Sequence, residues 1–344
     1  MRKGLLALFI IFTLVLSACS SNSKEGGANK PTESPNAQQE QNNGEADKDK
    51  EKDKENQGTD TGQTFDDGVD EAKLKETLDQ FPAAAVERVV TTSVPITEML
   101  HVLGVTPVGV PTSTNPIPAA FDQVERIGSP MQPDLEVVTA LQPQLLIGAE
   151  SLRSTLEKNL EGIKLERAYM RTESFDDLKL SFKALGTYFN KQEEMNAVLK
   201  SISDKEAELE KKAEGKQLPT VMLIIGTSDS FMVMSEKSYL GSLVNKLGAD
   251  NIATSILKVS DTYSPINMEN VVEADPDIIL VLASGDHGAT EDKFQKEVEK
   301  NEIWTKLSAY QNKKVHILDY SMFGVTSISN VEKALTKISE YFYQ

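Results

Sequence analysis

The chain is organised around the segment Ile127-Gly128-Ser129-Pro130-Met131-Gln132-Pro133-Asp134-Leu135-Glu136. Proline fixes φ at about −65° and has no backbone N–H, so a methionine between two prolines is expected on a stiff loop. Such a loop can present one side chain to a ligand. The acidic residues Asp134 and Glu136 suit the first turn of a helix, where the helix dipole favours negative charge. The segment therefore predicts a rigid loop that shows Met131 and leads directly into a helix.

The same pattern returns in the second half of the chain. Residues 131–136 lead through a short helix to Pro143 and a strand at 145–148, and residues 266–270 lead through a short helix to Pro276 and a strand at 277–282. Each half thus has a glutamate, a turn of helix, a proline and a strand. Open α/β sheets bind ligands at the carboxyl ends of their strands. We therefore expect two similar lobes with a ligand cleft between them.

Short strands alternate with helices throughout both halves, which indicates a largely parallel sheet in each lobe. In the first lobe we expect strands at 87–92, 107–110, 145–148 and 165–170, and helices at 96–103, 134–141 and 152–160. In the second we expect strands at 220–226, 230–234, 277–282 and 315–318, helices at 240–247, 267–273, 293–307 and 331–343, and loops at 285–288 and 323–324.

Two helical segments, 174–189 and 192–213, separate the lobes. The second is dense in charge and spans roughly 30 Å as a helix, about the width of a small domain, so it is expected to be a rigid connector. The predicted fold class is α/β, with two Rossmann-like lobes joined by a single long helix. The first lobe covers residues 86–173, the connecting segment 174–213 and the second lobe 214–344.

The chain begins with a segment typical of a bacterial signal peptide, residues 1–18. Two basic residues precede an apolar run at 5–16 that is too short for a comfortable membrane span. The run ends in Leu16-Ser17-Ala18 before Cys19, the only cysteine, and this resembles a lipobox in which the cysteine becomes the lipidated N-terminus. A plain secretory signal with an incidental cysteine is the alternative. One cysteine also excludes an internal disulfide framework.

The segment from 20 to 64 has no valine, isoleucine, leucine, methionine or aromatic residue. It cannot bury enough apolar surface to offset its ordering entropy, so we interpret it as a disordered tether. Together with the lipidated Cys19 and a lead-in that has a weak helix near 70–78, the tether makes up residues 19–85. The formal net charge of −17 argues against nucleic-acid binding, which needs a basic face.

Several motifs together resemble the helical-backbone (class III) substrate-binding lipoproteins of ABC importers, and more narrowly the haem-binding lipoproteins of the iron-regulated surface determinant system. The resemblance covers residue 88 to the C-terminus and rests, besides the lipobox, on Val89-Val90-Thr91-Thr92-Ser93-Val94-Pro95-Ile96-Thr97-Glu98, Pro107-Val108-Gly109-Val110-Pro111-Thr112-Ser113, Gly128-Ser129-Pro130-Met131-Gln132-Pro133, Lys237-Ser238-Tyr239-Leu240-Gly241 and Phe323-Gly324-Val325-Thr326. It implies haem b as the transported ligand. It also implies delivery to a permease dimer and its ATPase, haem donors at the cell surface, and a lipid anchor on the extracellular face of the cell membrane.

The resemblance further implies that the haem iron is held by a methionine of the first lobe and a histidine of the second, a familiar ligand pair for haem. The methionine falls on Met131, for which an ordinary core position is the alternative. Of the three histidines, His101 lies in an apolar helix and His316 in a strand. His287 lies in a glycine-flanked loop after a strand and is the expected ligand, although the family's histidine follows this strand more closely.

Other contacts are expected from the same resemblance. The helix start at Val94, Pro95, Ile96 and Thr97 is a candidate to bind the haem propionates through its backbone N–H groups, although these residues can equally serve the helix alone. Ser113 and Thr114, in the following loop, are further candidates. Tyr239 and Phe323 are candidates to line the porphyrin or to lie in the core. Glu136 and Glu269 match the two glutamates that dock on permease arginines, and the alternative is a solvated glutamate at a helix start.

Three other functions stay open. A hydroxamate siderophore or corrinoid receptor would share the fold, but no arginine follows Arg171, so the second lobe offers no guanidinium to an anionic siderophore. A zinc or manganese receptor is less favoured because the three histidines do not cluster. An enzyme is disfavoured because the chain has no Gly-x-Gly-x-x-Gly, Walker or Gly-x-Ser-x-Gly motif. We expect a binding protein and not an enzyme.

Overall fold

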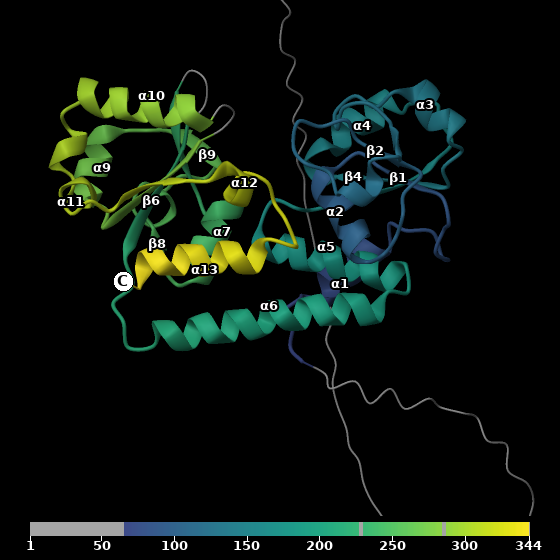
Figure 1. The fold of residues 1–344 in the computed structure, drawn as a ribbon, viewed down its shortest axis with the longest axis horizontal. Helices are drawn as coiled ribbons and strands as arrows, with labels where there is room; N and C mark the ends of the chain where they lie inside the picture. The colour runs from purple at the N-terminus through teal and green to yellow at the C-terminus, as the bar shows by residue number, and fades with distance from the viewer. Residues whose placement is uncertain (1–64, 227–229, 284–286, 344) are drawn as a thin grey trace, which may run out of the picture. The chain divides into compact units, whose positions relative to one another are not determined.

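Two separate β-sheets organise the described part of the chain (Figure 1). The structure, a computed structural model, describes residues 65–226, 230–283 and 287–343, apart from the side chains of 283–291. The expected signal segment, the lipobox at Cys19 and the tether up to residue 64 lie outside these residues. Within the described ranges, no helix is both long and apolar enough to cross a membrane.

The first sheet has five parallel strands in the order β3-β2-β1-β4-β5. The central strands β1 and β4 are buried along their whole length, as expected for a parallel sheet with helices on both faces. The strands are β1 (Val89–Thr91), β2 (Gly109–Val110), β3 (Glu125–Arg126), β4 (Leu145–Ala149) and β5 (Glu166–Met170). The helices between them are α2 (Val94–Val102), α3 (Leu135–Ala140) and α4 (Arg153–Asn159), with short 3-10 turns η1 (Ala119–Phe121) and η2 (Glu150–Leu152).

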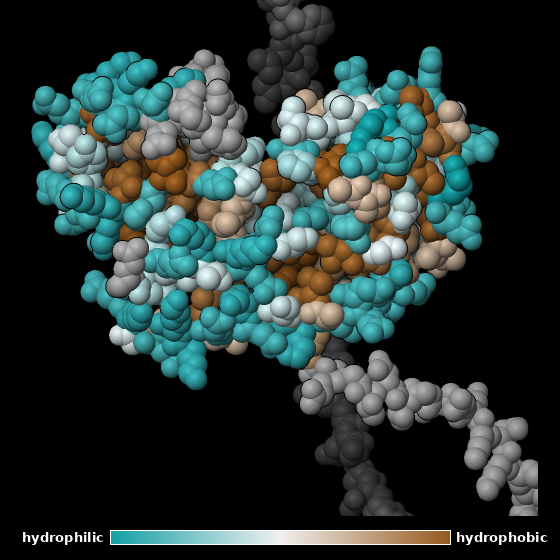
Figure 2. Space-filling view, in the orientation of Figure 1, coloured by the Kyte–Doolittle hydropathy of each residue, from teal (hydrophilic) through white to brown (hydrophobic). Residues whose placement is uncertain are grey.

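Two helices carry the chain from the first lobe to the second. Helix α5 (Phe175–Tyr188) is capped by Ser174, whose hydroxyl accepts the N–H of Asp177 at 3.1 Å. Asn190 then takes a left-handed φ of 55°, and α6 (Gln192–Ala213) follows. Helix α6 has 22 residues and lies along the lower edge of the view, where the surface is hydrophilic (Figure 2). The expected connecting helix is confirmed.

Helix α1 (Glu71–Leu78) packs onto this connecting segment. Leu74 is buried in the main core, and the Lys183 ammonium pairs with the Asp67 carboxylate at 2.8 Å. The Lys179 ammonium donates to the Asp67 carbonyl at 2.9 Å. Residues from about 65 onward therefore belong to the folded body and hold the start of the described chain against α5.

The second sheet is mixed, in the order β11-β10-β6-β7-β9, and β8 pairs with the start of β6. Strands β6, β10 and β11 are parallel, whereas β7 is antiparallel to both its neighbours. Only residues 227–230 separate β7 from β6, and a parallel crossover needs about a dozen or more. The strands are β6 (Thr220–Gly226), β7 (Phe231–Met234), β8 (Asp250–Asn251), β9 (Tyr263–Pro265), β10 (Ile278–Ala283) and β11 (Val315–Leu318).

Helices cover both faces of the second sheet. Alternate residues of β6 supply two cores, since Val221 and Leu223 belong to the main core and Met222 and Ile224 to a second one. The main core also contains side chains of α7 (Tyr239–Lys246), α13 (Val331–Phe342), α5 and α6. The second core contains side chains of α8 (Ile252–Ser255), α9 (Met268–Ala274), α10 (His287–Lys300) and α11 (Ser308–Gln311).

For the helix expected at 293–307, the predicted start and the predicted end are both wrong. Helix α10 begins at His287 and ends at Lys300, and a 3-10 turn, η3 (Trp304–Lys306), follows. The side chain of Asn301 accepts the N–H of Ile303 at 3.2 Å, an Asx turn that competes with the helix. The apolar spacing of the helix continues beyond this turn, so periodicity alone did not show the break.

The two expected loops also differ from the structure. His287 and Gly288 belong to α10 rather than to a loop at 285–288, and residues 284–286 lie outside the described ranges. The segment at 323–324 closes a short helix, α12 (Tyr320–Phe323), whose start is capped by the Asp319 carboxylate at 2.8 Å from the N–H of Ser321. The other expected helices and strands are confirmed in type and order.

Candidate ligand-binding cleft

A cavity of about 550 Å³ lies between the two lobes. The first lobe contributes α2 and the loop after β2, and the second contributes α12 and the loop that leads to α13. Its volume falls within the range of about 300–1,000 Å³ typical of small-molecule sites. The lining residues are Val94, Pro95, Glu98, His101, Thr114, Asn115, Pro116, Ile117, Pro118, Tyr320, Ser321, Val325, Thr326, Ser327, Ser329 and Asn330.

Among the described lining residues, all but three have side chains that do not titrate. Prolines, valines and one isoleucine form the walls, and hydroxyl and amide groups lie between them. The three titratable residues are Glu98, His101 and Tyr320. None of the described lining residues is a lysine or an arginine. The cleft therefore suits a ligand with a large apolar body better than a compact, highly charged anion.

Glu98 joins the two lobes at the wall of this cleft. Its Oε1 accepts the hydroxyl of Ser327 at 2.7 Å, and its Oε2 accepts the N–H of Ile328 at 3.1 Å. The acceptor is on α2 of the first lobe, and both donors lie in the second lobe between α12 and α13. Hydrogen bonds to a carboxylate are roughly twice as strong as neutral ones, so Glu98 ties this loop to α2.

The start of α2 forms one wall of the cleft. Val94 and Pro95 line it, whereas Ile96 and Thr97 are fully buried. Pro95 has no N–H, and the N–H of Thr97 donates to the Ser93 carbonyl at 2.9 Å. Of the backbone donors expected to bind an anion at this helix start, only the N–H groups of Val94 and Ile96 therefore remain.

The two loop residues expected beside that helix start differ in position. Thr114 lines the cleft. The hydroxyl of Ser113 accepts the N–H of Asn115 at 3.0 Å, and Ser113 is not among the residues that line the cavity. The contribution of this loop to the wall therefore begins at Thr114.

Tyr239 and Phe323, the other expected porphyrin contacts, lie in the main core. Their exposed fractions are 8% and 3%, and neither lines the cleft. Burial raises the pKa of the Tyr239 phenol, with a further contribution from the nearby Glu98 carboxylate. Tyr239 therefore stays protonated at neutral pH.

The loop that carries Met131 is a tight turn held at several points. Gly128 has a left-handed φ of 89° and bridges to Pro133, and the Asn159 amide donates to the Met131 carbonyl at 2.8 Å. The Met131 side chain is 58% exposed, so a core position is excluded. Met131 follows the carboxyl end of β3 but is not among the residues that line the 550 Å³ cavity.

The three histidines occupy different environments. His287 is the first residue of α10 and follows β10 after residues 284–286, and its side chain lies outside the described part. His316 is in β11 and stacks on Tyr341 at 4.3 Å, so its expected structural place in the strand is confirmed. His101 is exposed on α2, lies edge-on to Phe121 at 5.4 Å and lines the cleft.

Glu136 and Glu269 occupy equivalent positions in the two lobes. Each is exposed and is the second residue of a short helix. The Asp134 side chain accepts the N–H of Glu136, and the Asn267 side chain accepts the N–H of Glu269, both at 3.0 Å. The internal repetition seen in the sequence therefore extends to the way in which each helix is capped.

Glu98, His101 and Tyr320 line the cleft but were not expected there from the sequence. One signal was present for the α2 residues. Val94, Glu98 and His101 are spaced i, i+4 and i+7, which places two polar groups on one stripe of an otherwise apolar helix. No comparable signal marked Tyr320, because α12 itself was not expected.

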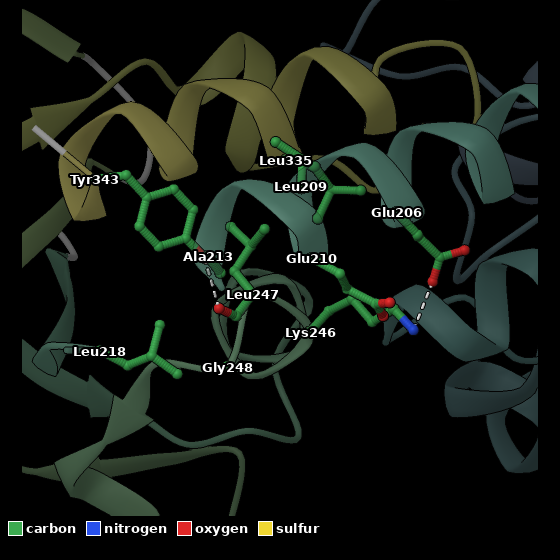
Figure 3. Close-up of a pocket in the computed structure, with 10 residues that line it drawn as sticks. All are labelled: Glu206, Leu209, Glu210, Ala213, Leu218, Lys246, Leu247, Gly248, Leu335 and Tyr343. Carbon is green, nitrogen blue, oxygen red and sulfur yellow. Dashed lines mark hydrogen bonds and ion pairs between the residues drawn. The ribbon is translucent and has the colours of Figure 1, made fainter. Parts of the chain in front are cut away.

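A second cavity, of about 170 Å³, lies at the end of α6 (Figure 3). Four leucines line it, namely Leu209 of α6, Leu335 of α13, and Leu218 and Leu247 outside the helices. At one side the Tyr343 hydroxyl donates to the Leu247 carbonyl at 2.9 Å, and at the other Lys246 pairs with Glu206 at 2.6 Å. The Lys246–Glu206 ion pair joins the connecting helix to the second lobe, whereas the Tyr343–Leu247 hydrogen bond lies within that lobe. The cavity therefore lies where α6 packs against the second lobe.

Comparisons with known proteins agree with this architecture. The model of the periplasmic binding protein family matches residues 89–321. This chain belongs to that family. The high-affinity heme uptake system protein IsdE of Staphylococcus aureus (strain MRSA252) is 32% identical over 262 residues, which cover 75% of this chain and 87% of IsdE.

Solved structures of related proteins show the same fold. S. aureus IsdE complexed with heme matches with a TM-score of 0.66 and 30% identity, over 75% of this chain and 99% of that one. An ABC transporter substrate-binding protein from Listeria monocytogenes EGD-e matches with a TM-score of 0.67 and 31% identity, over 74% of this chain and 98% of its own. S. aureus SirA complexed with staphyloferrin B shares only the fold, at 20% identity and a TM-score of 0.64.

These relationships confirm the predicted fold class and the broad function. The protein is a periplasmic binding protein of the class III type, the substrate-binding component of an ABC transporter, and it is not an enzyme.

Proposed function

We propose that this periplasmic binding protein captures haem b in the cleft between its lobes and delivers it to the permease dimer of an ABC importer, which its ATPase drives. The observation that carries the proposal is the lining of the 550 Å³ cavity, which is rich in proline and aliphatic side chains and has no lysine or arginine among its described residues. Haem is a broad apolar plate with two propionates. The similarity to IsdE, a heme uptake protein, supports the same ligand.

The same lining argues against a carboxylate or catecholate siderophore. Such ferric complexes carry several negative charges, and burying them calls for cationic partners. The cleft instead offers the carboxylate of Glu98, already bonded to the opposite lobe. A hydroxamate siderophore or a corrinoid has less negative charge and is the alternative that the experiment below distinguishes.

We propose Met131 and His287 as the axial ligands of the haem iron, which accepts thioether and imidazole groups. Two observations support them. The Met131 side chain is exposed on a turn whose carbonyl is held by Asn159, so the thioether has no packing role to lose. His287 begins α10 just beyond β10, and Met131 follows β3, so each comes after the carboxyl end of a strand, where ligands of α/β lobes bind.

The remaining parts of the proposal concern the membrane. Cys19 is lipidated after removal of residues 1–18, and the segment up to residue 64 tethers the lobes to the extracellular face of the cell membrane. Haem then comes from donor proteins at the cell surface. Glu136 and Glu269, exposed and matched in the two lobes, dock on arginines of the permease.

Absorption spectroscopy tests the ligand and its coordination. Haem added to the purified apoprotein gives a saturable Soret band, and the Met131→Ala and His287→Ala variants each change its position and weaken loading. His101→Ala is the matched control, because it removes the described histidine that lines the cleft while leaving both proposed ligands in place.

Three outcomes overturn parts of this proposal. No Soret band, together with saturable binding of a ferric hydroxamate or a corrinoid, replaces haem as the ligand. Unchanged spectra for both alanine variants refute the axial assignment. A spectral change in His101→Ala with none in His287→Ala moves the imidazole ligand from α10 to α2.

A further inference from the structure

The second lobe carries a second groove, and all of its lining residues belong to that lobe. It has a volume of about 520 Å³ and is bounded by α10 and by the segment that leads from β9 into α9. None of its lining residues is shared with the interlobe cavity. They are Ser230, Phe231, Pro265, Ile266, Met268, Lys293, Lys296, Glu297, Lys300 and Trp304.

One wall of this groove is apolar and well ordered by aromatic contacts. Phe294 lies behind the wall and packs edge-on against both Phe231, at 5.6 Å between ring centroids, and Trp304, at 5.5 Å. Ile266 and Met268 continue the wall toward α9. Such a surface gains free energy when an apolar molecule covers it, in proportion to the area removed from water.

Trp304 brings an unsatisfied donor to this wall. The residue is 2% exposed, and its indole N–H has no acceptor among the described residues. A buried donor without a partner costs roughly 1–3 kcal/mol, so such groups usually have an acceptor in their functional state. An oxygen atom of a ligand in the groove would supply the acceptor that no described residue provides.

The facing wall is basic. Lys293, Lys296 and Lys300 are spaced along one face of α10, in a chain whose formal net charge is −17. Lys296 and Lys300 are exposed and form no ion pair within the described ranges. Glu297 is the only carboxylate among the described residues that line the groove, where it faces three lysines.

We propose that this groove is a second ligand site, which takes a carboxylate carried on an apolar chain or ring. The apolar body of the ligand lies on Phe231, Ile266 and Met268, and the carboxylate meets the ammonium groups of Lys296 and Lys300. The site is separate from the haem cleft, and it neither requires nor excludes haem as the transported ligand.

The chain contains a single tryptophan, Trp304, so its fluorescence reports directly on this groove. Titration of the apoprotein with decanoate is expected to shift the Trp304 emission saturably. Decan-1-ol, which has the same chain and no charge, is expected to bind at least about tenfold more weakly, because it lacks the charge-assisted contacts.

Two double variants test whether the carboxylate of decanoate contacts Lys296 and Lys300. Lys296→Gln with Lys300→Gln is expected to weaken decanoate at least about tenfold, whereas Lys211→Gln with Lys212→Gln, which removes the same charge from the exposed end of α6, leaves it unchanged. No saturable shift with decanoate, equal binding of decan-1-ol, or unaltered binding in the α10 variant each refutes the site. A haem titration of the same proteins, followed by the Soret band, tests the haem proposal independently.

Discussion

Gly128 is the residue that shapes the Met131 turn. Its φ of 89° lies in the left-handed region, and a Cβ at this position would lie 2.8 Å from the Asp134 nitrogen and 2.9 Å from the Gln132 carbonyl oxygen. Both contacts are with backbone atoms, which cannot move aside as a side-chain end can. The turn is therefore available only to glycine, and a proposed iron ligand depends on it.

Gly128→Ala is expected to lower the free energy of unfolding by more than the roughly 1–2 kcal/mol of left-handed strain alone, because steric overlap is added. Gly162→Ala is the matched control, since Gly162 also has a positive φ, 81°, but no atom within 4 Å of an added Cβ. Urea unfolding of both variants measures the difference. Equal losses would show that the turn adapts to a Cβ.

His316 gives the stability of the second lobe a pH dependence. Burial lowers the pKa of this imidazole, and the nearby charges of Lys337 and Lys314 lower it further. The unfolded chain, with an ordinary pKa of about 6.5, therefore binds more protons than the folded chain below that pH. Stability is expected to be full above about 6.5 and to fall as the pH drops below it.

The variant His316→Phe is expected to remove this part of the pH dependence, because phenylalanine keeps a ring against Tyr341 and does not titrate. Urea unfolding at pH 7.5 and pH 5.5 is the measurement, with His101→Phe as the control for an exposed histidine. If the free energy of unfolding falls equally in the wild type and in His316→Phe between the two pH values, His316 is not the source of the pH dependence.

At the scale of elements, α2 has two faces with different roles. Ile96, Met99 and Leu100 are fully buried in the main core, whereas Glu98 and His101 face the cleft. Through Glu98 the helix also holds the loop before α13, so one helix supports the first lobe, lines the cleft and contacts the second lobe.

Glu98→Ala is expected to destabilise the protein by about 2 kcal/mol, since it removes two hydrogen bonds to a charged acceptor. It is also expected to increase amide hydrogen exchange in residues 325–330, which the carboxylate holds. Glu193→Ala, an exposed position on α6, is the control. Unchanged exchange in the loop would show that other contacts fix the two lobes.

Over the whole molecule, the two lobes present Glu136 and Glu269 in the same capped geometry. If both dock on permease arginines, Glu136→Arg with Glu269→Arg is expected to reduce haem uptake at least about tenfold through charge repulsion, without changing haem binding. Uptake by cells and the Soret titration measure the two effects separately.

The control for this double variant is Glu161→Arg with Glu299→Arg, which places the same charge change at exposed positions in both lobes. Full uptake in the Glu136 and Glu269 variant would exclude these glutamates from docking. Equal loss in both double variants would show a general effect of charge and not a specific contact.

Local signals in the sequence determined most of the fold. The acidic or amide caps at Asp134 and Asn267 and the serine cap at Ser174 act within three residues of themselves, and each starts a helix where it was expected. Runs of consecutive aliphatic residues predicted the central strands correctly, because they too are local signals in the sequence. At Asn301 a turn ends the helix although the helical spacing of apolar residues continues beyond it. The apolar spacing therefore placed the end of this helix too late.

The sequence alone also determined the family, the two-lobed architecture and the exposed turn at Met131. Only the tertiary structure decided what the cleft is made of. Glu98 meets Ser327 and Ile328 across about 230 positions of the chain, and no local propensity or period encodes a contact of that separation. The cleft composition depends on how two sheets and their connecting helices pack, so it becomes visible only when the lobes are placed together.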